Sequence, residues 1–243
     1  AQLVSRFAYD VGGTMTVFLY GGAMGTILAV LLSFKEGASI NAHPEYSASR
    51  MSRTLALIGS VFCWVFFPTL NMNISPQLFL FSNAGIATFF CISTSVVTMV
   101  ALCLVVDRRL NLRCLITAPI AGGVIVGSSS LHIYNPLEAM ILGVTAASLQ
   151  FLFNKIELKM GMRPLWSNGV FFLFAVQGFL GGFFSSVFRA INKTSGSFGA
   201  LYTALTGRLN KDQADQFVGT FISLGLGMLS GLVMYILLRF IIK

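Results

Sequence analysis

The chain has 243 residues and a formal net charge of +8, yet only 10% of its residues are charged while 56% are hydrophobic. With a mean hydropathy of +0.81, the chain is too apolar to be a water-soluble domain. Lysine and arginine residues form no block interleaved with aromatic residues, which argues against a nucleic-acid-binding protein. Apolar runs of about twenty residues recur from end to end and predict an all-α polytopic membrane protein.

The alternation of apolar windows and polar breaks predicts seven transmembrane helices in a single domain, residues 1–243. Glycines recur at four-residue spacing, for example Gly178 and Gly182, which predicts close helix packing in lipid. The expected helices cover about residues 10–34, 54–72, 79–106, 115–131, 136–153, 168–190 and 216–242.

Basic residues are distributed unequally between the two ends of these predicted helices. One end carries Lys35, Arg50, Arg53, Arg108, Arg109, Arg113, Lys155, Lys159, Arg163, Arg239 and Lys243. The other end carries Arg6, Arg189, Lys193, Arg208 and Lys211. The positive-inside rule then predicts an N-terminus outside and a C-terminus inside. The organelle stays open between the mitochondrial inner membrane and the plasma membrane.

Several short segments resemble one membrane protein family. Residues 10–15, Asp-Val-Gly-Gly-Thr-Met, resemble the start of the fifth core helix of Rh proteins. Residues 62–71 are similar to the sixth-helix motif around its Trp and Pro, and residues 118–128 to the Ala-Gly-Gly motif of the eighth. Residues 169–182 match the tenth helix in glycine spacing. In this order, the motifs identify the chain as a member of the ammonium transporter and Rh family.

The resemblance implies only part of the family fold. Family members have two inverted five-helix repeats and a long final helix. The chain corresponds to the last helix of the first repeat, the whole second repeat and the closing helix. It begins without a methionine, so we expect either a processed N-terminus or a numbering that starts within a longer chain.

The family carries two pore histidines at positions that hold Phe18 and Phe174 here. The resemblance implies that these imidazoles handle the proton separated from ammonium, which phenylalanine cannot do. The family's outer gating phenylalanine aligns with Leu70, and an aspartate aligns with Trp166. We therefore expect Phe18 and Phe174 to fill a former pore; a slipped alignment or a still-open path is the alternative.

Other motif residues are expected to be structural. Asp10 precedes two glycines at a helix start, where its carboxylate can cap the helix; attraction of a cation is the alternative. The further structural positions are Gly12, Gly13, Trp64, Pro68, Gly122 and Gly123.

No constellation for catalysis, cofactor binding or metal binding is apparent, so we expect no enzyme. His43 and His132 lack partners at ligand spacing, and Glu138 suits the first turn of a helix. The cysteines have no C-x-x-C spacing and are expected to be buried apolar residues: Cys63, Cys91, Cys103 and Cys114.

These observations favour a transport-inactive structural or accessory subunit of a larger membrane complex, with lipids and other membrane subunits as partners. The alternative is a half channel for ammonia or a small neutral gas, completed by a separate N-terminal half. A homotrimer, as the family resemblance implies, is the alternative assembly.

Overall fold

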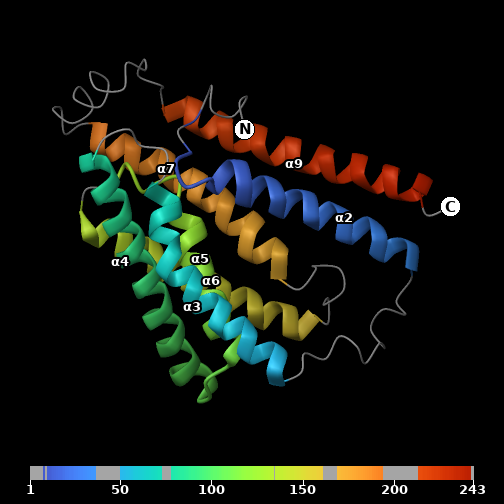
Figure 1. Cartoon of the computed structure of the whole chain (residues 1–243), viewed down its shortest axis with the longest axis horizontal. Coiled ribbons are helices and arrows are strands. Elements are labelled where there is room, and N and C mark those ends of the chain that lie inside the picture. Colours follow the sequence, from blue (N-terminus) through green and yellow to red (C-terminus); the bar gives the residue numbers. More distant parts are fainter. Residues whose placement is uncertain are drawn as a thin grey trace.

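The computed structural model describes residues 8, 10–36, 50–72, 78–133, 135–160, 169–193 and 213–241. In these ranges every regular element is helical, which confirms the expected all-α class (Figure 1). The elements are the π-helical turn η1 (Thr14–Leu19), α2 (Tyr20–Glu36), α3 (Arg50–Met72), α4 (Leu78–Leu102), the π-helical turn η4 (Cys103–Asp107), α5 (Leu112–Val126), α6 (Pro136–Met160), the π-helical turn η6 (Phe171–Val176), α7 (Gln177–Lys193) and α9 (Gln213–Ile241).

Each of the seven expected helices has a counterpart, but the counterparts differ in length. Within the described part of the chain, six helices are long and apolar enough to cross a membrane. The exception is α5, which has 15 residues. At 1.5 Å per residue it measures about 22 Å, less than the roughly 30 Å of a bilayer's hydrocarbon core.

The helix expected over residues 115–131 ends at Val126, so its predicted end was wrong. The chain turns after Val126 because its next backbone groups bond to other elements. Gly127 O accepts a hydrogen bond of 3.1 Å from Gly12 N, and Ser128 N donates one of 2.8 Å to Thr14 Oγ1. These partners lie more than one hundred positions away in sequence, so local patterning could not reveal them.

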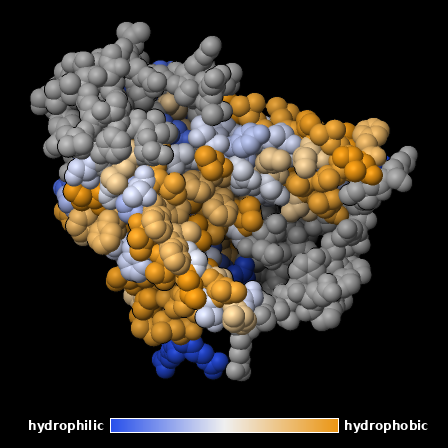
Figure 2. Space-filling model, in the orientation of Figure 1, coloured by the Kyte–Doolittle hydropathy of each residue, from blue (hydrophilic) through white to orange (hydrophobic). Residues whose placement is uncertain are grey.

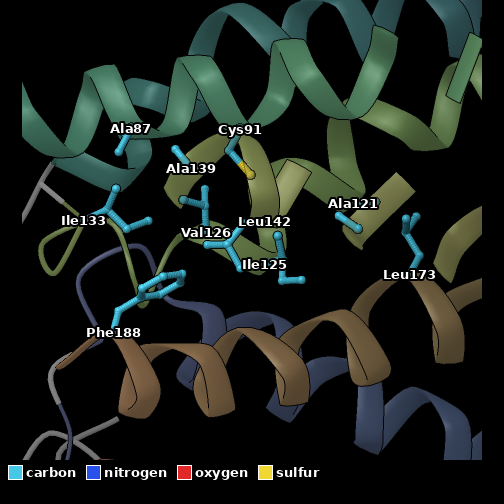
Figure 3. Packing of buried hydrophobic residues seen from close by; sticks show 11 residues of the cluster. Ala87, Cys91, Ala121, Ile125, Val126, Ile133, Ala139, Leu142, Leu173 and Phe188 are labelled. Carbon is cyan, nitrogen blue, oxygen red and sulfur yellow. The ribbon is translucent and has the colours of Figure 1, made fainter. Parts of the chain in front are cut away.

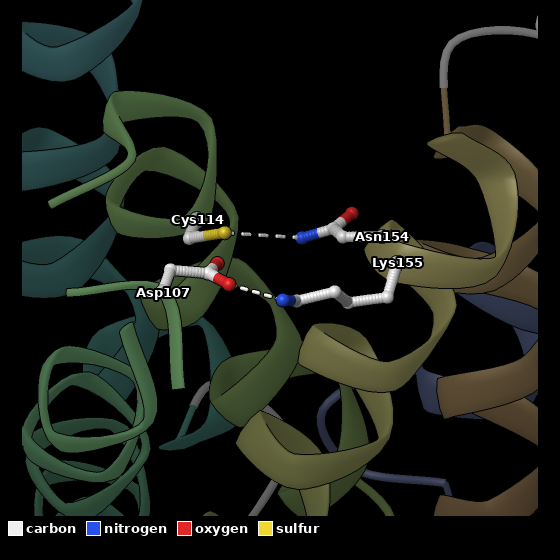
Figure 4. Close-up of polar contacts among 4 residues, drawn as sticks. All are labelled: Asp107, Cys114, Asn154 and Lys155. Atoms are coloured by element: carbon white, nitrogen blue, oxygen red, sulfur yellow. Dashed lines mark hydrogen bonds and ion pairs between the residues drawn. The ribbon is translucent and has the colours of Figure 1, made fainter. Parts of the chain in front are cut away.

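The helix expected over residues 136–153 continues to Met160. The polar residues from Asn154 onward were read as a break, but in the folded chain Asn154 and Lys155 have partners (Figure 4). Asn154 Nδ2 donates to Cys114 Sγ at 3.6 Å, and Lys155 Nζ pairs with Asp107 Oδ1. Polar side chains with partners are compatible with a continuing helix in an apolar environment.

The short helix α5 lies at the centre of the fold, in contact with α3, α4, α6 and α7. Its neighbours α4 and α6 pack along each other, and α2 packs along α9 on the other side of the molecule (Figure 1). Side chains from α4, α5, α6 and α7 meet in the largest buried cluster, where Ile125 and Leu142 are fully buried beside Phe188 (Figure 3).

Apolar side chains also cover much of the outer surface (Figure 2). Phe62 is 59% exposed on α3 and Leu237 is 52% exposed on α9. In water such a surface would be unfavourable, whereas lipid solvates it without cost. The chain is an integral membrane protein.

Candidate functional site

Phe18 and Phe174, from η1 and η6, lie against each other in the structure. Their ring centroids are 5.9 Å apart and the ring planes differ by only 9°. Offset parallel pairs at this distance contribute about 0.5–1.5 kcal/mol beyond their buried area. The two residues singled out in the sequence, far apart along the chain, are therefore direct neighbours.

A third ring completes this pair. Phe67, on α3, is 4% exposed, and its centroid lies 5.8 Å from that of Phe18. Trp64 packs against the same cluster, one turn earlier on α3. Sequence analysis missed Phe67, whose signal was its place between Trp64 and Pro68 in a matched motif. We call Phe18, Phe67 and Phe174 the phenylalanine cluster.

Two glycines allow the helices that carry the pair to cross closely. Gly22 follows Phe18 by one turn, and a Cβ there would lie 2.5 Å from Ala175 N. Gly178 follows Phe174 by one turn, and a Cβ there would lie 2.9 Å from Leu19 N. Gly22 thus lies against the backbone that follows Phe174, and Gly178 lies against the backbone that follows Phe18.

The reciprocity extends along both helices. Gly25 faces Val170, and Gly181 faces Thr14. The glycines that precede the two phenylalanines, Gly13 and Gly169, both have positive φ, of 70° and 88°. All these pairs have the same sequence separation, so the two segments are related by an approximate two-fold operation, which is typical of inverted repeats in transporters.

Both phenylalanines lie in π-helical turns. Such turns are rare and are found at functional sites more often than chance predicts. Their occurrence at the same place in both halves of the crossing marks this crossing as the candidate site. Sequence periodicity did not reveal them, because a π turn adds one residue without changing hydropathy.

Asp10 holds the entry to η1. Its Oδ2 accepts hydrogen bonds from Met15 N at 3.0 Å, Thr16 N at 2.7 Å and Thr16 Oγ1 at 2.8 Å. The two backbone N–H groups among these donors belong to the first turn of η1, where a helix leaves its N–H groups without intrahelical partners. This geometry is that of the expected cap.

Gly12 and Thr14 connect this entry to the end of α5. A Cβ at Gly12 would lie 2.5 Å from Gly127 Cα, and Thr14 Oγ1 donates a 2.9 Å bond to Val124 O. Close approach and a left-handed backbone at Gly13 explain why two glycines stand together in this motif.

The paired glycines of α5 serve two different neighbours. A Cβ at Gly122 would lie 2.9 Å from Ser95 Cβ on α4, and one at Gly123 would lie 2.6 Å from the Phe67 ring on α3. Pro68 lies inside α3. The Ala-Gly-Gly motif therefore brings α5 against two helices at once and holds Phe67 in place.

Other predicted residues lie away from the phenylalanine cluster. Leu70 is 56% exposed and is not among the residues packed against it. His132 lies in the turn after α5, where burial, with the charge of Arg189 adding to it, lowers the pKa of His132 to about 3. Glu138 lies in the first turn of α6, as expected. His43 and Trp166 lie outside the described residues.

No group of metal-ligating side chains gathers within the described ranges, and their four cysteines are free thiols. The side chains that meet at the crossing are aromatic and apolar. The rings of Phe18, Phe67 and Phe174 provide no nitrogen or oxygen that could bind, relay or share a proton.

Comparison with known proteins agrees with this architecture. The family model described as Ammonium Transporter Family matches residues 2–243. Ammonium transporter Rh type C from Bos taurus is 26% identical over 243 residues, which cover 95% of this chain and 52% of that protein. Ammonium transporter Rh type B from Sus scrofa is 29% identical over 177 residues, covering 71% and 38%. The chain spans about half the length of the relatives it matches.

Two solved structures share the fold. Rh50 from Nitrosomonas europaea, reported as a channel of the Rhesus protein family, superposes with a TM-score of 0.75 at 20% identity, covering 99% of this chain and 57% of that one. Mep2 from Saccharomyces cerevisiae superposes with a TM-score of 0.72 at 21% identity, covering 98% and 52%. By its matched length, its fold and its motifs, this chain belongs to the ammonium transporter family.

Proposed function

We propose that this chain is a transport-inactive member of its family and serves as a structural subunit of a larger membrane complex. The observation that carries the proposal is the phenylalanine cluster at the crossing of the two glycine-containing helices. The aligned positions imply that Phe18 and Phe174 replace the family's pore histidines. The stacked rings would then occupy the former conduction axis.

The physical argument concerns both chemistry and space. Ammonium conduction that separates a proton needs a group that titrates near neutral pH, as imidazole does. The phenylalanine cluster has no titratable atom, and its rings are in mutual contact at 5.8 and 5.9 Å between centroids. The phenylalanine cluster therefore offers no proton relay, and in this proposal its packed rings obstruct an apolar path along that line of contacts.

The exposed surface supports a partner. One face of α3 has an apolar hollow of about 400 Å³, lined by Leu57, Ile58, Val61, Phe62, Val65 and Phe66. In the described part of the chain, apolar side chains of this hollow and of the outer face of α9 are exposed. Lipids and other membrane subunits are the partners we propose for them, with no enzymatic role.

A channel for ammonia or a small neutral gas is the second candidate. Phe18 and Phe174 are only partly buried, and the adjacent Val17 is 60% exposed. A second protein segment on that side would complete the wall of a pore, with the phenylalanine cluster as one side. A homotrimer would be the assembly of that alternative.

Permeability of proteoliposomes separates the two candidates. We expect the full chain to give no ammonia or carbon dioxide permeability above that of bare lipid, measured by stopped-flow change of internal pH. The double variant Phe18→His/Phe174→His restores the titratable pair, and Phe240→Ala, at a site 78% exposed on α9, serves as the control. The structural proposal would be refuted if the unaltered chain gave a permeability above that of bare lipid and the histidine variant, but not the control, abolished or altered it. That result would establish the channel.

The proposed orientation places the α4–α5 connection inside the cytosol or the matrix. Arg108 in this connection is exposed. Its replacement by cysteine should react with an impermeant maleimide only after the membrane of right-side-out vesicles is opened.

A further inference from the structure

We propose that an open cavity at one end of the helix bundle binds the phosphate headgroup of an anionic phospholipid. The cavity measures about 730 Å³ and lies between the start of α3, the α4–α5 connection and the start of α5. The residues of its lining that matter for the argument are Arg53, Asp107, Arg109, Leu110, Leu112 and Arg113. We call it the arginine cavity.

Arginines reach this cavity from separate elements. Arg53 belongs to the first turn of α3, Arg109 to the α4–α5 connection, and Arg113 to the first turn of α5. Arginines from different elements that line one cavity suit a phosphate group, because each planar guanidinium can donate two parallel hydrogen bonds to it. Residues on a single helix face could not surround a headgroup in this way.

The acidic residue of the lining does not cancel this charge. Asp107 forms an ion pair with Lys155, which reaches it from α6 (Figure 4). That pair is neutral as a unit, so the arginines of the lining determine the sign of the cavity. The pair also joins the end of η4 to α6 and thus holds one wall of the cavity.

The local backbone keeps the connection compact. Arg108 adopts a left-handed conformation with φ of 51°, which ends η4. Asn111 Oδ1 then accepts a 3.1 Å hydrogen bond from Arg113 N and caps α5. The positive end of the α5 dipole therefore faces the same region, which adds to the attraction of an anion.

The surroundings favour a lipid over a free phosphate ion. Leu110, in the lining, is 56% exposed, and Val105 and Val106, on the adjacent η4, are 77% and 54% exposed. Figure 2 shows the strongly hydrophilic tip of the molecule directly beside an apolar surface. A headgroup in the arginine cavity would leave its acyl chains against these side chains, at the depth where the polar and apolar layers of a bilayer meet.

Native mass spectrometry of the detergent-solubilised full chain tests the proposal. Phosphatidylglycerol is titrated against phosphatidylcholine, and the binding constant of the first lipid is measured. Basic residues near an anionic membrane surface each contribute about fivefold in binding. We therefore expect Arg53→Gln/Arg109→Gln to weaken phosphatidylglycerol binding by about 25-fold. Phosphatidylcholine has the same phosphate but no net charge, so its binding should weaken much less, and the preference for phosphatidylglycerol should fall.

Two further variants control for charge and geometry. Arg239→Gln removes a charge near the end of α9, away from the cavity, and should leave phosphatidylglycerol binding within twofold of the unaltered chain. Arg53→Lys/Arg109→Lys keeps the charge but loses the paired donors, and should give an intermediate affinity. Equal loss in Arg239→Gln, or unaltered binding in Arg53→Gln/Arg109→Gln, would overturn the proposal. Displacement of the lipid by millimolar inorganic phosphate would instead assign the cavity to a soluble anion and overturn the lipid proposal.

Discussion

At the scale of single residues, small differences in side-chain size decide whether the two central helices can cross. Gly21 and Gly22 are adjacent in sequence but have different surroundings. A Cβ at Gly22 would lie 2.5 Å from Ala175 N and 2.9 Å from Phe174 C, both rigid backbone atoms, whereas a Cβ at Gly21 would meet nothing within 4 Å. The same substitution should therefore have opposite effects at the two positions.

We predict that Gly22→Ala destabilises the protein by about 1–3 kcal/mol, because α2 must move away from η6. Gly21→Ala should be neutral or stabilising by up to about 1 kcal/mol, since alanine is the better helix former in open space. Thermal unfolding in detergent, followed by circular dichroism, measures both. Equal midpoints for the two variants would show that the crossing is not as close as the structure has it.

In the motif of residues 10–15, the contacts of Asp10 and Gly12 indicate a structural role. Asp10 Oδ2 accepts three hydrogen bonds from Met15 and Thr16 and so caps the start of η1, and Gly12 approaches Gly127. These contacts fold the chain start onto the end of α5. The cation-attracting alternative for Asp10 is not needed to account for this geometry.

At the scale of elements, the turn between α5 and α6 carries a pH-sensitive group. Burial, aided by the charge of Arg189 on α7, lowers the pKa of His132 from 6.5 to about 3. In the unfolded chain His132 gains a proton near pH 6.5, while in the folded chain it stays neutral down to about pH 3. The favourable contribution of neutral His132 is therefore complete above pH 6.5 and is lost as the pH falls through this window.

We predict that the midpoint of thermal unfolding falls as the pH is lowered from 6.5 towards 4, with a contribution from His132 of at most about 1.4 kcal/mol per pH unit. His132→Asn cannot take up this proton and should show a shallower dependence on pH. The difference between the two slopes is the measurement, because carboxylates affect both proteins alike. Parallel slopes would mean that His132 is protonated in the folded protein as well.

The elements also differ in what holds them. The short helix α5 does not cross a bilayer by its own length, and contacts with α3, α4, α6 and α7 surround it. By contrast, α3 and α9 have long exposed apolar faces. The position of α5 is therefore determined by its contacts within the protein. The exposed faces of α3 and α9 are instead solvated by lipid or covered by a partner.

At the scale of the whole molecule, the native assembly distinguishes the proposed functions. We predict that the protein, extracted from its own membrane in mild detergent, runs as part of a large complex with unrelated membrane subunits. The physical reason is the exposed apolar surface of α3 and α9, which a partner subunit can cover. Native gel electrophoresis followed by mass spectrometry of the band identifies the subunits. A compact particle that contains only copies of this chain would contradict the structural role and direct attention to the channel.

Much of this protein was predictable from its sequence because lipid imposes simple rules on a chain. A helix that crosses a bilayer needs a long apolar run, so composition and hydropathy predicted the all-α class and most helix positions. Short motifs with glycines at defined spacing also identified the family and pointed to Phe18 and Phe174. Those signals are local, and a single sequence contains them.

What the sequence could not show are relations between distant segments. The contact between Phe18 and Phe174, and the contact of Phe67 with this pair, depend on the crossing of η1 and η6. The reciprocal glycines determine how closely these segments cross. The early end of α5 depends on hydrogen bonds from Gly12 and to Thr14. The convergence of Arg53, Arg109 and Arg113 depends on the packing of three elements. Hydropathy describes what each residue prefers as its solvent, and only the tertiary structure decides which residues become its neighbours.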